Sequence, residues 1–99
     1  IWSIITTVIT YLQSAANALG GMTALANSIG VSQSAPSMWR SRGEVPADRC
    51  PAIERATDGI VTCEQLRPDV HWVRIADPDW PHPDGRPAID VAAPAKSAA

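Results

Sequence analysis

Apolar residues recur every three or four positions along the first twenty residues, and this spacing predicts a helix over residues 3–19. The crowding of β-branched residues there favours a strand by propensity alone. Adjacent apolar pairs such as Ile4 and Ile5 break strict alternation, however, and the alanine-rich continuation favours a helix that ends at Gly20. The apolar stripe of this helix is predicted to hold Ile1, Ile5, Val8, Leu12, Ala16 and Leu19.

A second, shorter apolar pattern follows. Leu25 and Ile29 share the inward face of a predicted helix of about two turns, which Gly30 ends. Ser32 is a favourable N-cap for a third helix over 32–40.

Pro36 lies where that third helix makes its first backbone hydrogen bonds. Proline has no N–H to donate, and its ring crowds the carbonyl four residues earlier. With Ser32 as the N-cap, that carbonyl lies at the helix edge, so the cost should be well below the roughly 3 kcal/mol of a mid-helix proline. We therefore expect a helix that is tight or 3₁₀-like over its first turn and regular over 37–40.

The middle of the chain predicts two more short helices. A proline-initiated turn covers 46–50, and a helix then runs from Pro51 to a stop at Gly59. In the single-turn helix that follows, Thr62 and Gln65 stand at capping-box spacing. The inward residues of these two helices are predicted to be Ala52, Ile53, Ala56 and Leu66.

The composition changes after Pro68, because six of the nine prolines lie in the last third of the chain. The segments HWVRIA and PAIDVA alternate apolar and polar residues, as short strands do. A β-hairpin is therefore predicted within a proline-rich extension over 69–93, with Trp72 and Trp80 clamping it to the helices. Residues 94–99 are expected to be a disordered tail.

The chain has 99 residues and a net charge of −2, which fits one small domain and indicates no general affinity for nucleic acid. Residues 1–39 carry no charged side chain, and residues 40–67 carry five arginines and five acids. Any positive patch must therefore be local, and Arg40 and Arg42 form its first pair. The other arginines of the middle segment are expected to form ion pairs on a solvated face, where Arg49 and Arg55 meet Asp48, Glu54 or Asp58.

Neither enzyme chemistry nor a metal site is indicated. Cys50 and Cys63 are too few for a disulfide framework and are expected to be buried small hydrophobes. The two histidines do not stand at ligand spacing, and no set of acid, base and nucleophile emerges, so we expect no cofactor and no enzyme. The apolar start is too short and too often interrupted by polar residues to span a membrane, so a cytoplasmic protein is expected.

The pattern around Gly30 has the parts of a helix-turn-helix. Ala26 is small enough for two helices to cross closely, and Gly30 can adopt the positive φ that the turn requires. The apolar anchors on the buried sides are expected to be Leu25, Ile29, Val31 and Trp39. These patterns predict a mainly α fold with a helix-turn-helix domain over 3–68.

Three segments, TALANSIGVSQSAPSMW, VPADRCPAIERATDG and VTCEQLRPDV, together resemble the Cro/YdaS-type helix-turn-helix family of prophage-associated regulators. The resemblance covers roughly residues 4–71. It implies a small, compact bundle of four to five helices that binds operator DNA. Members of the family are transcriptional repressors, and some are labelled antitoxins because of their genetic neighbourhood. Pro36 departs from the pattern, because helix-turn-helix domains usually carry Val or Ile there.

The outward side of the third helix supplies the candidate DNA contacts, since Val31, Pro36 and Trp39 are expected to point inward. Base edges are expected to be contacted by Gln33, Ser34, Ser37 and Met38. Phosphates are expected to be contacted by Thr23, Ser32, Arg40 and Arg42. The alternative is that these polar residues form an ordinary solvated helix face without a role in binding.

The expected mode of action is repression by a homodimer on double-stranded DNA, with half-sites about 34 Å apart. Either the apolar first helix or the tail strands supply the dimer contact, and the sequence does not choose between them. One alternative function is a protein-interaction or antitoxin module whose tail binds a partner such as a toxin. Another is a self-assembling, coat-like protein.

Overall fold

The computed structural model describes residues 2–90, and it describes side chains from residue 7 onward. These residues form five α-helices, one 3₁₀ helix and one two-stranded antiparallel sheet, so the predicted mainly α fold is confirmed. The helices are α1 (Trp2–Leu19), α2 (Met22–Ile29), α3 (Ala35–Arg42), η1 (Ala47–Arg49), α4 (Cys50–Ala56) and α5 (Cys63–Leu66), and the strands are β1 (Trp72–Ile75) and β2 (Arg86–Ile89).

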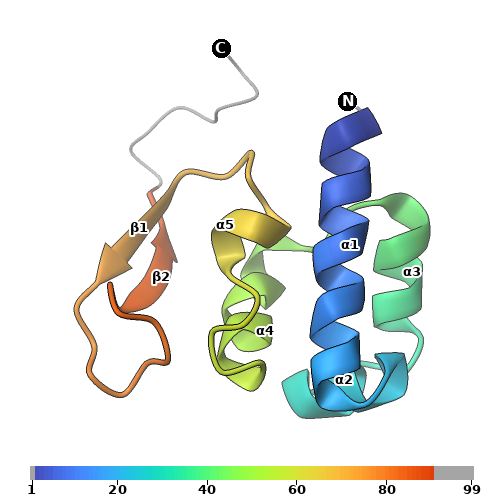
Figure 1. Ribbon diagram of the computed structural model, residues 1–99, viewed down its shortest axis with the longest axis horizontal. Coiled ribbons are helices and arrows are strands. Elements are labelled where there is room, and N and C mark those ends of the chain that lie inside the picture. The colour runs from blue at the N-terminus through green and yellow to red at the C-terminus, as the bar shows by residue number, and fades with distance from the viewer. Residues whose placement is uncertain (1, 91–99) are drawn as a thin grey trace.

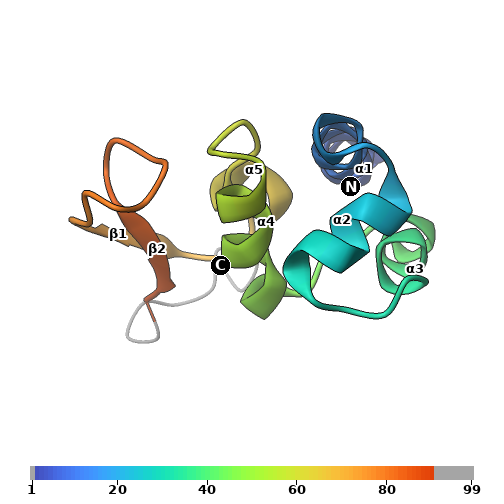
Figure 2. The same cartoon turned by 90° about the horizontal axis from the view of Figure 1, so that it is seen from below.

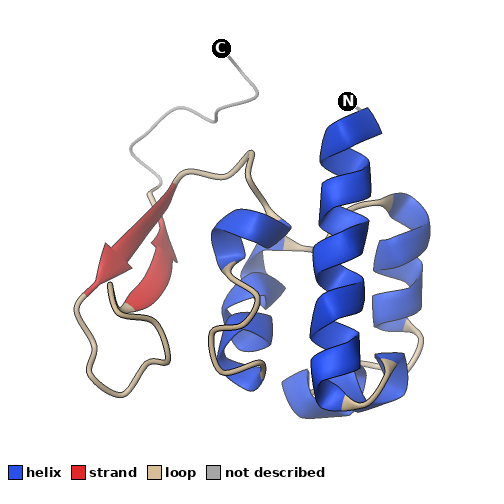
Figure 3. Ribbon diagram, in the orientation of Figure 1, coloured by secondary structure: helices blue, strands red, loops and turns tan. Residues whose placement is uncertain are grey.

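The long helix α1 stands in the middle of the helical part of the molecule (Figure 1). α3 flanks it on one side, α4 and α5 lie on the other, and α2 crosses its C-terminal end. The hairpin lies beyond α4 and α5, at the opposite end of the molecule from α3 (Figures 2 and 3). The two ends of the fold therefore present separate surfaces.

The core follows the predicted stripe of α1. Val8, Leu12 and Ala16 are buried, and Leu19 packs against them half-buried. The side chains of Ile1 and Ile5 lie outside the described part of the chain. The core cluster is completed by Ala15, Leu25, Trp39, Val45, Cys50, Ile53, Val61, Cys63 and Leu66.

The turn between α2 and α3 forms as the sequence predicts. Gly30 is the C-cap of α2, with φ 75° and ψ 32°, in the left-handed region that glycine favours. The N–H groups of Gly30 and Val31 both donate to the carbonyl of Ala26, which closes the helix end. Ala26 itself is fully buried.

The predicted start of the third helix is wrong. α3 begins at Ala35, and its N-cap is Ser34 instead of Ser32. Ser32 lies in a turn that precedes the helix, where its carbonyl accepts a hydrogen bond from the Ala35 N–H at 3.0 Å. Pro36 is therefore in the first helical turn, where its missing N–H would have had no intrahelical partner. The helix is thus delayed to Ala35, a tight turn closed by the bond between Ser32 and Ala35, three residues apart, precedes it, and the part predicted to be regular, 37–40, lies within α3.

The inward face of α4 differs from the prediction at one important position. Ile53 is buried as expected, but Ala52 and Ala56 are only half-buried. Glu54 takes the deep position instead, with no exposed surface. A helix face predicted from apolar spacing alone has no place for a buried carboxylate.

The capping box of α5 is confirmed. The Gln65 N–H donates to Thr62 Oγ1 at 3.3 Å, and the Thr62 N–H donates to Gln65 Oε1 at 2.9 Å. Cys50 and Cys63 are buried free thiols, as predicted, and burial raises the pKa of the Cys50 thiol to about 12.

The predicted hairpin is also present. β1 and β2 pair antiparallel, with Trp72 opposite Ile89 and Ile75 opposite Arg86. Along β1 the residues alternate between half-buried and exposed, as the alternation in HWVRIA indicates. The expected tail over 94–99, with the last residues of the predicted second strand, lies outside the described residues. In the described residues, no helix is both long and apolar enough to cross a membrane.

Candidate nucleic-acid interface

The helix α3 lies at one edge of the molecule with one side against the core and the other open to solvent (Figures 1 and 2). Pro36 and Trp39, three residues apart, form its buried side. Val31 and Ala35 pack half-buried against the same core. These contacts fix the orientation of α3, so the residues between the anchors must face outward.

The four candidate base contacts are all exposed. Gln33 and Ser34 lie in the turn before α3, and Ser37 and Met38 lie in its first half. Met38 is 54% exposed, so its apolar side chain is open to solvent. Within residues 2–90 the structure gives the Gln33 side chain no hydrogen-bond partner, whereas the hydroxyl oxygens of Ser32 and Ser34 are 3.4 Å apart.

The four candidate phosphate contacts are exposed too, but they are not equivalent. Thr23 is in the first turn of α2, and Ser32 is in the turn before α3. Arg40 and Arg42 are in the last turn of α3. Residues two positions apart on a helix are separated by about 200° around its axis. The two guanidinium groups therefore leave α3 on opposite flanks.

Arg40 is on the flank of α3 that faces α1. Its Nη1 donates to Gln13 Oε1 at 3.2 Å, and Gln13 Nε2 donates to Asn17 Oδ1 at 3.0 Å. This chain of neutral partners steers the guanidinium without cancelling its charge. The positive charge of Arg40 therefore stays available at the surface.

Ser41 completes the exposed side of α3, and the sequence reasoning missed it. It is exposed and lies one helical turn after Ser37 and Met38, so the three side chains share a face. The spacing of four residues from Ser37 was the signal that would have found it.

The acidic residue nearest in sequence to Arg40 and Arg42 is Glu44, and it pairs with an arginine outside α3. Residues 1–43 contain no acidic residue, and Glu44 is the first. Its Oε1 lies 3.5 Å from Nη1 of Arg67, which also binds Asp69 and the carbonyl of Val45. The surface of α3 is thus locally positive on a chain whose total charge is negative.

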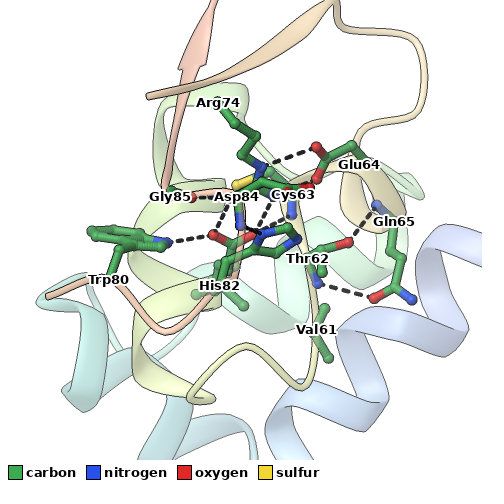
Figure 4. Close-up of polar contacts among 12 residues, drawn as sticks. Val61, Thr62, Cys63, Glu64, Gln65, Arg74, Trp80, His82, Asp84 and Gly85 are labelled. Carbon is green, nitrogen blue, oxygen red and sulfur yellow. Dashed lines mark hydrogen bonds and ion pairs between the residues drawn. The ribbon is translucent and has the colours of Figure 1, made fainter. Parts of the chain in front are cut away.

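A second polar cluster lies at the other end of the molecule, where the hairpin meets α4 and α5 (Figure 4). We call it the Glu54 cluster; its members are Glu54, Cys63, Glu64, Arg74, Trp80 and Gly85. Arg74 Nη1 and Nη2 bind the two carboxylate oxygens of Glu54 at 2.6 and 2.7 Å. Trp80 Nε1 donates to Glu54 Oε2 at 2.5 Å, and the Cys63 N–H donates to Oε1 at 3.1 Å.

Arg74 is saturated in this cluster. Besides Glu54, it donates from Nε and Nη2 to Glu64 at 3.2 and 2.5 Å, and from Nη1 to the Gly85 carbonyl at 3.1 Å. Five hydrogen bonds match the five N–H groups of a guanidinium. Burial by itself raises the pKa of Glu54, but the hydrogen bonds from Arg74, Trp80 and Cys63 outweigh it and hold that pKa below its ordinary value.

The prediction of ion pairs for Arg49 and Arg55 is wrong. Within the described residues, no ion pair joins either arginine to Asp48, Glu54 or Asp58. The guanidinium of Arg55 lies over the Trp80 ring instead, 5.8 Å from its centroid. The partners of Glu54 are 20 and 26 residues away, so spacing along the sequence gave no signal for them.

The predicted clamping role of the two tryptophans is confirmed. Trp80 donates to Glu54 on α4, and Trp72 Nε1 donates to the Arg67 carbonyl at 3.0 Å while its ring packs against the core. His82, which the sequence places near two aspartates, accepts a hydrogen bond from the Asp84 N–H at Nδ1. Among residues 2–90, no group of three or more His, Cys, Asp or Glu side chains is arranged to hold a metal ion.

Comparisons with known proteins match most of the helical part of the chain. Residues 12–75 match the family described as bacterial toxin YdaS. A relative from Escherichia coli (strain K12), named "Putative transcriptional regulator YdaS", is 51% identical over 55 residues, which are 54% of this chain and 56% of that relative. The chain thus matches just over half the length of that relative.

A solved structure gives a second comparison. It is titled "Structure of the Cro protein from putative prophage element Xfaso 1 in Xylella fastidiosa strain Ann-1". The TM-score is 0.58 with 55% sequence identity, and the alignment covers 66% of this chain and 95% of that chain. The family match includes the whole of α2 and α3 and stops at Ile75, the last residue of β1. The loop after Ile75 and the strand β2 follow the matched region.

Proposed function

The chain belongs to the bacterial toxin YdaS family, and from this premise we propose that it binds double-stranded DNA in a sequence-specific way and represses transcription by occupying an operator. The names of its two relatives, a transcriptional regulator and a Cro protein, support a regulator that works by binding DNA. The proposed activity is binding and needs no chemical step.

The observation that carries this proposal is the exposed polar side of α3. Buried Pro36 and Trp39 hold the helix in place, so its outer side can enter a major groove without any rearrangement of the core. Gln33 and Ser34 stand at the N-terminal end of α3, which is the end of a recognition helix that reaches base edges. The amide of Gln33 matches the donor and acceptor of an adenine edge, and Met38 suits a thymine methyl group.

The two arginines at the other end of α3 suit phosphates. Because Arg40 and Arg42 leave the helix on opposite flanks, they would reach the two backbones that border one groove. Ser32 and Thr23 would add neutral hydrogen bonds to the same backbones. The arginines would position the protein, and the side chains of Gln33, Ser34, Ser37, Met38 and Ser41 would read the sequence.

We propose that the chain binds as a homodimer, because one helix-turn-helix reads few base pairs. Two-fold symmetry would place two recognition helices on half-sites about 34 Å apart. Selection of bound duplexes from a random DNA pool with the full chain tests this. An enriched motif with two related half-sites is expected, and a pool without enrichment would contradict sequence-specific binding.

A negative charge introduced on α3 tests whether this helix is the surface that contacts DNA. Ser37→Glu puts a carboxylate on the exposed side and is expected to abolish binding to the selected duplex, since phosphates repel it. Ile60→Glu introduces the same charge at a residue that is 66% exposed in the turn between α4 and α5. This control is expected to keep most of the affinity. Equal losses in the two variants would remove α3 as the contact surface.

A further inference from the structure

The loop between β1 and β2 forms a shallow cavity of about 560 Å³, wide open to solvent, that the proposed DNA contact does not use. Two turns shape it: the Trp80 N–H donates to the Asp77 carbonyl at 3.1 Å, and the Gly85 N–H donates to the His82 carbonyl at 3.0 Å. We call it the loop cavity; it is lined by Ala76, Asp77, Pro78, Trp80, Pro81, His82 and Pro83.

The loop is held rigidly against the helices. Gly85 has φ 98°, and a Cβ there would lie 1.9 Å from the Ile75 carbonyl oxygen, so only glycine closes the loop this tightly. A Cβ on Gly59 would lie 2.2 Å from the Pro81 carbonyl oxygen, so the α4–α5 turn also touches the loop closely. With Trp80 bound to Glu54, the cavity is formed in advance of any ligand.

The wall of the loop cavity is poor in hydrogen-bond donors. Three of its seven residues are prolines, which have no N–H. Both N–H groups of Trp80 are already used, by the Asp77 carbonyl and by Glu54. What remains is an indole ring, backbone carbonyls, the carboxylate of Asp77 and the imidazole of His82, whose Nδ1 already accepts from the Asp84 N–H. The matching ligand is a cation that carries many donors.

The charge of the loop points to the same ligand. Residues 76–85 contain three aspartates and no lysine or arginine. Arg86 lies only loosely against Asp77, with 3.9 Å between Nε and Oδ2, and Arg74 is saturated by the Glu54 cluster. The guanidinium of Arg55 already lies over the Trp80 ring, 5.8 Å from its centroid, so this ring accepts a guanidinium and an incoming cation must share it with Arg55. The same charge repels DNA phosphates.

We propose that the loop cavity docks an arginine- or lysine-bearing segment of a partner polypeptide. Charge complementarity identifies the occupant, because the loop holds three aspartates and no lysine or arginine. The loop cavity and α3 are at opposite ends of the molecule, so a partner bound there leaves α3 open to DNA (Figure 1). The loop follows the segment that matches the family, so this docking site belongs to the extension and not to the matched region.

Titration of the isotope-labelled full chain with a capped heptapeptide of alternating glycine and arginine tests this proposal by nuclear magnetic resonance. We expect the largest shifts at the Trp80 indole N–H and at residues 76–85. Asp77→Asn keeps the shape of the turn but removes the charge, and it is expected to weaken binding about threefold or more. Asp48→Asn removes an exposed charge on η1 and is expected to leave binding unchanged.

A matched peptide with glutamate in place of arginine is expected to cause no shift. Equal shifts from the two peptides would overturn the proposal, and so would shifts that map to α3 or an Asp77→Asn variant that binds as well as the original chain. Shifts at the Trp80 indole N–H and at residues 76–85 that grow with protein concentration in the absence of peptide would identify a second copy of this chain as the occupant and would also overturn it. None of these outcomes depends on DNA binding, which is measured separately on the selected duplex.

Discussion

Arg74 at the hairpin end and the arginines of α3 differ in burial and in the partners they bind. Arg74 is enclosed between two carboxylates and makes five hydrogen bonds, whereas Arg40 touches only a neutral glutamine and Arg42 is exposed. A carboxylate buried as deeply as Glu54 needs a paired cation, since its desolvation is otherwise uncompensated. A surface arginine has no such need, because water solvates it. The fully paired guanidinium of Arg74 stabilises the fold, whereas the exposed guanidinium groups of Arg40 and Arg42 remain available to a binding partner.

The largest expected effect comes from breaking the buried ion pair between Arg74 and Glu54. Arg74→Met removes the cation and leaves Glu54 buried, so the free energy of unfolding should fall by about 3–5 kcal/mol, as measured by urea denaturation. Arg86→Met, at an exposed residue with a loose ion pair, should cost less than about 1 kcal/mol. If Arg74→Met does not fold, Arg74→Lys keeps the charge and provides a measurable intermediate loss. Equal losses at positions 74 and 86 would show that burial of the pair contributes nothing.

A smaller loss of stability should come from protonating the Glu54 carboxylate at low pH. The pKa of Glu54 is lower in the folded chain than its ordinary value of 4.5, so the stability it contributes is complete above that value. That contribution should be lost as the pH falls from 4.5 towards the lowered folded-state pKa. Melting temperatures measured from pH 7 down to pH 3 should therefore drop more steeply for the original chain than for Glu54→Gln. Parallel curves for the two chains would contradict the ionised, hydrogen-bonded state of Glu54.

On the exposed side of α3, a single substitution should change the free energy by less, because it leaves no buried partner unpaired. Gln33→Ala should weaken binding to the selected duplex by about 1–3 kcal/mol and relax the base preference at one position, without changing the melting temperature. Fluorescence anisotropy on the selected duplex and on single-base variants of it measures both effects. An equal loss on scrambled DNA would remove Gln33 from the base-reading set.

The smallest expected change concerns the phosphate contacts. Arg40→Ala and Arg42→Ala should each reduce the slope of log affinity against log salt by about 0.9, and should weaken all duplexes alike. Arg86→Ala, which removes the same charge at the hairpin end, should leave the slope unchanged. If Arg86→Ala flattened the slope as much, the DNA would contact both ends of the molecule and the contrast between them would fail.

The helix-turn-helix end could be predicted from the sequence in most of its parts. The stripe of α1, the cap at Gly30 and the burial of Trp39 follow from spacing over a few residues, and such local patterns survive folding. The N-cap of α3 was placed two residues too early, because Ser32 and Ser34 are equally good N-caps by residue type. The packing of Pro36 into the core decided between them.

The Glu54 end could not be predicted in the same way. The capping box at Thr62 and the two short strands were visible in the sequence, yet Glu54 was assigned to a solvated face and paired with the wrong arginine. Its position on α4 gives no hint of burial, because a carboxylate is normally exposed. Only the return of the hairpin across α4 and α5 brings Arg74 and Trp80 to it.

The sequence by itself determined the elements of this protein, since helix periodicity, strand alternation and caps depend on neighbours within one or two turns. Tertiary structure alone decided which charges are paired and which are left open. Ion pairs join residues that are distant along the chain, and burial changes the cost of a charge by more than any local pattern does. For that reason the outward side of α3 was visible before folding, while the partners of Glu54 and the loop cavity beside them exist only once the hairpin has docked.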